Sequence, residues 1–237
     1  VALIYPTLPN ISHLEKYYPK QPLQIYSKDE VLIAEFGEER RDFIAISETP
    51  QQMINAILSI EDRRFFEHPG IDIIGITRAA LKNISGKSHE GASTITMQVA
   101  RNFFLTSEKT LKRKINEILL AIKIERTLSK EEILELYVNQ IYLGQRSFGF
   151  AAAANTYFGK NLDQLNLGET ALLAGLPKAP SRYNPLVRPH LAIKRQQDVL
   201  NSMLRHGYID KPTYIIALDD PLSLKEKFMK SELQADY

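Results

Sequence analysis

The chain has 237 residues, of which 44% are apolar and 24% are charged, and its formal net charge at pH 7 is +2. This composition excludes wholesale disorder, and the small net charge argues against a dedicated nucleic-acid binder. The sequence contains no cysteine, which excludes a disulfide framework, a thiolate nucleophile and a cysteine-ligated metal. No apolar run approaches the roughly 20 residues that a membrane-spanning helix needs, and no signal peptide is visible.

Residues 1–48 predict an extended and β-type segment. The first 22 residues show no periodicity, and short strands are expected near 23–26, 31–36 and 43–46, with a turn at 27–30. From residue 49 onward the patterns are helical. We therefore expect a mainly α-helical protein with a small N-terminal β element, a helical domain over 49–209, and a C-terminal helix and tail over 210–237.

Four helix starts carry capping signals. Thr49 precedes a proline that suits the first helical position, and Gln52 completes a capping box. Ser129 and Asn166 each stand three residues before a glutamate, which predicts two further capping boxes, and Asp210 opens a last helix. Another helix is expected from 111 to about 126, and its predicted core side consists of Leu111, Ile115, Ile118, Leu119 and Ile122.

Residues 83–96 interrupt the helical patterns. They contain two glycines, three serines and two threonines, which favour loop conformations and local side-chain hydrogen bonds. Loops that a rigid scaffold holds often carry function, and a mobile connector is an equally open interpretation.

Glu61 is the first candidate for chemistry. It follows the apolar positions 54, 57 and 58 at helical spacing, so its carboxylate is expected beside apolar surface. Partial desolvation raises the pKa of a carboxyl group and makes it a better base near neutral pH. The alternative is an ordinary helix-end carboxylate that pairs with Arg64 or His68.

Glu117 is the second candidate. It lies within residues 101–130, which hold eight basic and three acidic residues and therefore suggest an anionic partner. Arg113 and Lys114 lie one helical turn before Glu117, so the three side chains can share a face. A solvated salt-bridged face is the alternative, but these groups together with Lys109 also suit a phosphate or pyrophosphate. Two carboxylates in such different surroundings are typical of glycosyl chemistry.

Other catalytic patterns are missing from the sequence. The five histidines, at positions 13, 68, 89, 190 and 206, form no metal-binding spacing, so no metal site is predicted. There is no nucleophile elbow of the form GxSxG and no P-loop.

Several motifs resemble the family 51 peptidoglycan glycosyltransferases, the polymerase domain of class A penicillin-binding proteins of Gram-negative type. They occur in the family's order and spacing over residues 50–205, and they read "EDRRFFEHPG" (61–70), "GASTITMQ" (91–98), "RKINE" (113–117), "KEEILELYVNQIYLG" (130–144), "YFGK" (157–160) and "ETALLAGLPKAPSRYNP" (169–185). The sequence departs from the family pattern at Met97, where a glutamine is usual, and at Gln145-Arg146, where Asn-Gly is common.

This resemblance implies a lysozyme-like helical fold with a smaller, membrane-associated lobe. It also implies an inverting glycosyl transfer that joins lipid II units into β-1,4-linked glycan strands and releases undecaprenyl pyrophosphate. Glu61 would be the general base, and Glu117 would act with the cations at the pyrophosphate. The substrate-binding residues would be Asp62, Phe65, His68, Gly91, Ser93, Thr94, Gln98, Arg101, Lys109, Arg113, Lys114, Tyr137 and Asn139.

The resemblance further implies the partners and the location. These are lipid II and the growing glycan strand, at the periplasmic face of the inner membrane, with no nucleic acid. No cofactor is required, and a divalent cation, Mg or Mn, is compatible with the pyrophosphate. We expect a membrane anchor before residue 1 and a transpeptidase domain after residue 237; no Ser-x-x-Lys occurs in the chain, so no penicillin acylation is expected.

Membrane contact has a separate basis in the sequence. Isoleucines crowd residues 71–76, and Phe103 and Phe104 stand beside Arg101 and are expected to be exposed. Apolar side chains next to basic ones suit a bilayer interface, although core packing explains the isoleucines equally well. Two other functions stay open: a muramidase or lytic glycosidase of the same fold, and a non-catalytic glycan- or lipid-binding module.

Overall fold

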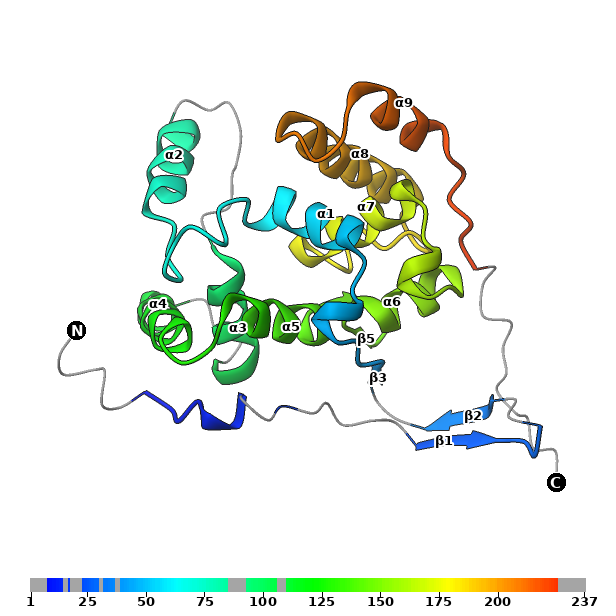
Figure 1. Ribbon diagram of the computed structural model, residues 1–237, viewed down its shortest axis with the longest axis horizontal. Helices are drawn as coiled ribbons and strands as arrows, with labels where there is room; N and C mark the ends of the chain where they lie inside the picture. The colour runs from blue at the N-terminus through cyan, green and yellow to red at the C-terminus, as the bar shows by residue number, and fades with distance from the viewer. Residues whose placement is uncertain are drawn as a thin grey trace.

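The computed structural model describes residues 8–14, 17, 23–29, 32–36, 39–84, 93–105 and 110–225. Its α-helices are α1 Gln51–Glu61, α2 Ile73–Ile84, α3 Ile95–Phe104, α4 Leu111–Glu125, α5 Lys130–Gln140, α6 Phe150–Phe158, α7 Leu167–Gly175, α8 Pro189–Arg205 and α9 Lys211–Asp219. Its strands are β1 Leu23–Tyr26, β2 Leu32–Phe36, β3 Arg40–Arg41, β4 Tyr142–Gly144 and β5 Ser147–Phe148. The expectation of a mainly α-helical fold is confirmed (Figure 1).

The helices pack in two groups. Helix α7 packs on α8, and α1 lies against both; α3 packs against α4 and α5. In Figure 1, α1 runs between α2 on one side and α8 on the other. One hydrophobic core joins these groups and also takes in Leu8, Ile11 and Leu14 from the N-terminal segment and Ala217 from α9. The domain boundaries at residues 48 and 209 stay a prediction.

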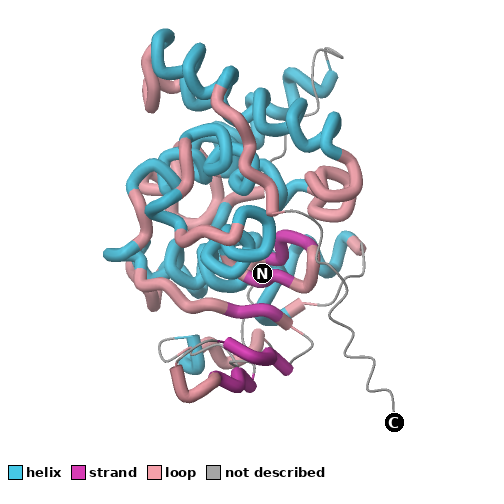
Figure 2. Tube along the Cα trace, turned by 90° about the vertical axis from the view of Figure 1, so that its right-hand side faces the viewer, coloured by secondary structure: helices cyan, strands magenta, loops and turns pink. Residues whose placement is uncertain are grey.

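The β element agrees with the sequence only in part. Strands β1 and β2 form an antiparallel hairpin, with Leu23 opposite Phe36, and it lies to one side of the helices in Figures 1 and 2. The strand expected at 43–46 is wrong, because the third strand is β3, which pairs in parallel with β5. The side chain of Asn139 instead bonds both main-chain groups of Ile44, at 2.9 and 2.8 Å, so a helix side chain takes the place of a strand partner.

Three of the four predicted helix starts are confirmed. Ser129 and Asn166 form complete capping boxes, and the side chain of Asp210 caps α9. The box at Thr49 is wrong: the Thr49 hydroxyl donates to the Ala45 carbonyl and ends the short 3-10 helix Ile46–Glu48. Gln52 donates instead to the Thr170 hydroxyl at 2.8 Å and so ties α1 to α7.

The predicted core side of α4 is confirmed at Leu119, which is 5% exposed, but it is wrong at its N-terminal end. Leu111 and Ile115 are 86% and 48% exposed, whereas Glu117, Leu120 and Ile124 are fully buried. The helix is therefore turned so that its buried face carries the Glu117 carboxylate together with apolar side chains such as Leu120 and Ile124. The sequence pattern failed because it assumed that buried positions are apolar.

The β4–β5 connection uses left-handed backbone without glycine. Gln145 and Arg146 have φ angles of 49° and 62°, the conformation of a two-residue hairpin turn that Asn-Gly normally supplies. The departure from the family's usual residues thus keeps the turn. The left-handed region is costly for such side chains, by roughly 1–2 kcal/mol per residue.

Gly149, at the start of α6, has a backbone that only glycine adopts easily. Its φ is 86° and its ψ is 157°, and a Cβ atom there would lie 2.9 Å from the Asn139 carbonyl oxygen. We expect Gly149→Ala to lower the free energy of unfolding by at least about 2 kcal/mol in urea denaturation. Gly207→Ala is the control, because Gly207 has φ 76° with open space around it, so only backbone strain of about 1 kcal/mol is expected. Equal losses in the two variants would contradict a packing role for Gly149.

Candidate active site

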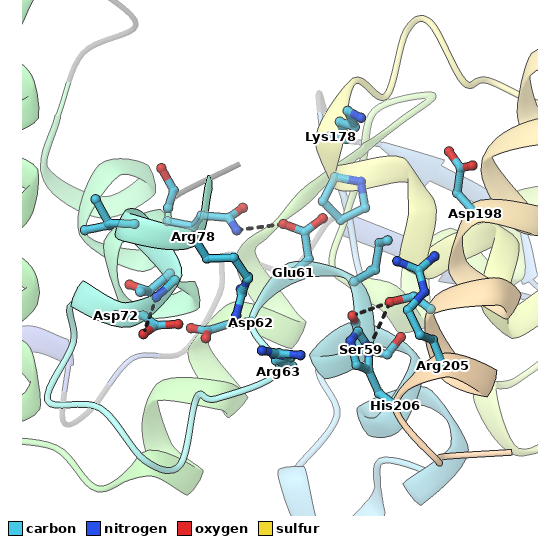
Figure 3. A pocket seen from close by; sticks show the side chains of 18 of the residues that line it. Ser59, Glu61, Asp62, Arg63, Asp72, Arg78, Lys178, Asp198, Arg205 and His206 are labelled. Atoms are coloured by element: carbon cyan, nitrogen blue, oxygen red, sulfur yellow. Dashed lines mark hydrogen bonds between the residues drawn. The ribbon is translucent and has the colours of Figure 1, made fainter. Parts of the chain in front are cut away.

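A cleft of about 630 Å³ lies where the C-terminal end of α1 meets α2, α3 and α8 (Figure 3). Its walls carry six arginine or lysine side chains against four carboxylates, so it is suited to an anionic ligand. The lining residues are Ser59, Ile60, Glu61, Asp62, Arg63, Asp72, Gly75, Ile76, Arg78, Ser93, Thr94, Gln98, Arg101, Pro177, Lys178, Arg195, Asp198, Asn201, Ser202, Arg205 and His206.

Glu61 is the last residue of α1, and its carboxylate lines this cleft. The side chain is only 13% exposed, and burial raises its pKa above the ordinary value. Gln98 on α3 donates to its Oε2 at 2.8 Å, which acts in the opposite direction, as do the charges of Arg195, Arg101 and Lys178. Neither alternative partner pairs with Glu61, since Arg64 bonds Glu67 and His68 bonds Asp62.

Arg195 and Lys178 are site residues that the sequence interpretation missed. Arg195 on α8 is 6% exposed; its Nη2 lies 3.8 Å from Glu61 Oε1, and its Nε donates to the Gly175 carbonyl at 3.0 Å. Lys178 follows α7 and lines the cleft on the other side of Glu61 from Arg205 (Figure 3). A signal for Arg195 exists: it shares the buried face of α8 with Ala192, Val199 and Leu200.

Asp62 and His68 hold the end of α1 to the start of α3. The main-chain N–H of Gly70 donates to His68 Nδ1, so the neutral ring carries its proton on Nε2 and donates it to Asp62 at 2.9 Å. Asp62 also accepts from the Ile95 N–H at the first turn of α3. Thr94 caps the same helix through the Met97 N–H and donates to the Gly70 carbonyl at 2.7 Å.

Glu117 lies at the centre of a second cluster. Its side chain is fully buried, and it accepts from Arg113 Nη1 at 2.7 Å and from Lys114 Nζ at 2.9 Å. This contradicts a merely solvated salt-bridged face. Lys114 also donates to the Ser93 hydroxyl at 2.8 Å, and Ser93 lines the cleft, so the cluster is joined to the cleft through one hydrogen bond.

The remaining predicted residues line the cleft, are buried away from it, or lie outside the described residues. Arg101 lines the cleft. Phe65, Tyr137 and Asn139 are buried: Lys130 sits 4.4 Å above the Phe65 ring, and the Tyr137 hydroxyl has no hydrogen-bond partner within the described residues. None of these three lines the cleft, and binding roles for them stay a prediction. Gly91 and Lys109 lie outside the described residues.

The described residues do not fit a protein-bound divalent cation. They contain no group of three or more histidine or carboxylate side chains that could hold a metal ion. Both oxygens of Glu117 already accept from cations. A cation bound to the pyrophosphate itself stays a prediction.

The surface of α2 is apolar at one point. Ile73 and Ile74 are 72% and 61% exposed. The prediction that Phe103 and Phe104 are exposed is wrong, because both side chains are partly buried. The Phe103 ring packs edge-on against the Tyr17 ring, with the ring centroids 4.9 Å apart. Among the helices in the described ranges, none is both long and apolar enough to cross a bilayer.

The transglycosylase family model matches residues 29–204, which contain the cleft except for Arg205 and His206. The chain belongs to the transglycosylase family. It is 51% identical over 238 residues to penicillin-binding protein 1A of Neisseria gonorrhoeae, an alignment that covers 100% of this chain and 30% of that relative. It is 50% identical over 233 residues to penicillin-binding protein 1A of Pseudomonas aeruginosa, covering 98% of this chain and 28% of the relative.

Structure comparison agrees with this assignment. The crystal structure of penicillin-binding protein 1A from Haemophilus influenzae matches with a TM-score of 0.52 and 33% identity, over 88% of this chain and 22% of that protein. This transglycosylase chain thus spans less than a third of the length of the curated relatives named above. The family that the sequence motifs indicated is confirmed, and the match reaches into the N-terminal β segment.

Gln98→Leu tests the hydrogen bond at Glu61. This bond lowers the pKa of a carboxyl group that burial raises, so its loss raises the pKa further. If the ionised form of Glu61 is the active one, the acid limb of the pH profile of kcat/KM moves to higher pH in the variant. At a pH well above the Glu61 pKa of both the wild type and the variant, the activity changes less. A uniform loss at every pH would instead indicate that Gln98 contacts the substrate.

Proposed function

We propose that this chain is a peptidoglycan glycosyltransferase that polymerises lipid II. Lipid II is a disaccharide-peptide carried on undecaprenyl pyrophosphate, and the product is a β-1,4-linked glycan strand. The observation that best supports this proposal is the position of the Glu61 carboxylate in a cation-rich cleft. Among the described residues no cation bonds it directly, and the nearest cationic group is that of Arg195, at 3.8 Å.

Glu61 takes the part of general base. It removes the proton from the 4-hydroxyl of the acceptor's terminal sugar, and that oxygen attacks the anomeric carbon of the donor from the face opposite the leaving group. The attack inverts the configuration from α to β. Burial favours this role, because a carboxyl pKa nearer to neutrality makes the ionised group a stronger base.

The leaving pyrophosphate carries its own negative charge, so it needs cations more than an acid. Arg113, Lys114 and Arg101 supply them in this proposal, and Glu117 fixes the first two in place. The hydrogen bond from Lys114 to Ser93 supports this proposal, because it brings the Lys114 ammonium group to the wall of the cleft.

The proposed location is the periplasmic face of the inner membrane. The undecaprenyl chain of the substrate is embedded in the bilayer, and exposed Ile73 and Ile74 give α2 an apolar surface of the kind that suits an interface. Continuation into a transpeptidase domain stays a prediction; the relatives extend well beyond the part that they share with this chain.

The test is a polymerisation assay with labelled lipid II in detergent, followed by digestion of the product with a muramidase. Muramidase-sensitive polymer supports the proposal. Cleavage of preformed glycan strands without polymerisation would indicate the lytic alternative. Binding of lipid II with neither reaction would indicate a binding module.

A further inference from the structure

One end of the cleft gathers positive charge from residues that do not belong to the cluster around Glu117. Arg63 follows α1, Arg78 lies on α2, and Arg205 and His206 end α8, so three separate parts of the chain contribute to it. We call these four residues the arginine end. Figure 3 shows Arg63, Arg205 and His206 on one side of Glu61 and Lys178 on the opposite side.

The carboxylates nearest to the arginine end in the cleft are already engaged. Asp72 accepts from the Gly75 N–H at 2.9 Å and lies 3.4 Å from Arg64, and Asp198 lies 3.7 Å from Arg195. Asp62 is bonded to His68. Within the described ranges, neither Arg63 nor Arg205 has an ion-pair partner.

The charges at the arginine end act on one another. Burial lowers the pKa of His206, and the positive charges of Arg63, Arg205 and Arg78 lower it further. Ser202 contacts His206 Nδ1 at 3.2 Å and donates to the Ser59 carbonyl, so the ring is held against the end of α1. A cleft lined by like charges attracts an anion.

The substrate offers two kinds of anionic group, the pyrophosphate and the carboxylates of its peptide. The pyrophosphate has its candidate partners at Arg113 and Lys114, and Lys114 reaches the wall of the cleft at Ser93. Arg63 and Arg205 lie outside that cluster. We propose that the arginine end binds a carboxylate of the peptide on the sugar substrate, an inference that rests on the proposed function.

Binding, without turnover, tests this directly. The probe is the soluble disaccharide-peptide without lipid or pyrophosphate, in a form with free carboxylates and in a form with every carboxylate amidated. Calorimetric titration of the 237-residue chain is expected to give roughly tenfold tighter binding of the free acid, as for hydrogen bonds between charged groups. Equal affinity for both forms, or no detectable binding of the acid, overturns the proposal.

Two variants and a control locate the effect. Arg63→Gln and Arg205→Gln are each expected to remove most of the preference for the acid form, with no fall in Tm because a repelling charge is lost. Arg188→Gln should retain the preference; Arg188 precedes α8 at its other end, is exposed and does not line the cleft. Retained preference in both test variants overturns the proposal.

A third arm separates the peptide from the pyrophosphate. Titration with inorganic pyrophosphate should be insensitive to Arg63→Gln and Arg205→Gln. If these variants weaken pyrophosphate binding while the wild type does not prefer the acid form, the arginine end is part of the leaving-group site and the proposal is wrong. A failed polymerisation assay alone would count against the proposed function and leave this binding result standing.

Discussion

Glu61→Gln is expected to abolish polymerisation of lipid II, with a loss of at least roughly 10²–10⁴-fold, the usual contribution of a general base. Glutamine keeps the size of the side chain and an oxygen that accepts from Gln98, but it cannot take up a proton. The fold should survive, because Glu61 is partly exposed at a helix end and, within the part of the chain that the structure describes, makes no ion pair shorter than 3.8 Å. The rate of polymer formation and the Tm are measured together.

Glu67→Gln is the matched control for this experiment. It removes the same charge six residues further along, from a side chain that is 64% exposed and, among the described residues, pairs only with Arg64. Exposed pairs contribute little, so both activity and Tm should remain close to wild type. Polymer formation by Glu61→Gln at the wild-type rate would remove Glu61 from the mechanism and leave the cleft without its base.

Local signals were predictable from the sequence. A capping box needs only residues three positions apart, which is why Ser129 and Asn166 were identified correctly. The pairing of Glu117 with Arg113 and Lys114 was predictable for the same reason, since these residues lie within one helical turn. The capping box predicted at Thr49 was wrong because the preceding 3-10 helix competes for the Thr49 hydroxyl. That short helix is held by a contact with α5, where Glu135 accepts from the Ile46 N–H.

Contacts between distant segments were not predictable in this way. Arg195 lies 134 positions after Glu61 in the sequence, and nothing local to either residue indicates that α8 packs beside α1. The bond from the Gln98 amide to Glu61, which comes from a neighbouring helix, was not predicted, and substrate contact by Gln98 stays a prediction. The arginine end was missed for the same reason: its residues come from the end of α1, from α2 and from the end of α8.

The buried face of α4 was misjudged because function competes with periodicity there. Leu111 and Ile115 follow the apolar pattern but are exposed, and Glu117 occupies the interior. Glu117 shares the buried face with Leu120 and Ile124, which lie three and seven positions after it, so the apolar side chains of Leu111 and Ile115 fall on the exposed side. Buried charged residues of this kind are tolerated when they are hydrogen-bonded to partners.

Glu117→Ala is expected to cost both stability and activity. It removes the acceptor of two charge-assisted hydrogen bonds from a fully buried position. Arg113 is the more affected partner: its side chain is 17% exposed, and its Nε already has no hydrogen-bond partner among the described residues. Lys114 is 38% exposed and can turn to water. We expect a loss of about 2–4 kcal/mol in urea unfolding, below the upper range for a buried pair because both cations reach solvent.

Glu131→Ala is the control, because it removes a carboxylate of the same kind from an exposed position. Glu131 is exposed in the first turn of α5, where a negative charge contributes only about 0.3–1 kcal/mol through the helix dipole. Activity is then compared at a temperature where every variant is fully folded. If Glu117 positions the leaving-group cations, Glu117→Ala polymerises far more slowly than Glu131→Ala even there, because Arg113 and Lys114 are no longer fixed. If the two variants polymerise equally under those conditions, Glu117 stabilises the fold and has no part in expelling the pyrophosphate.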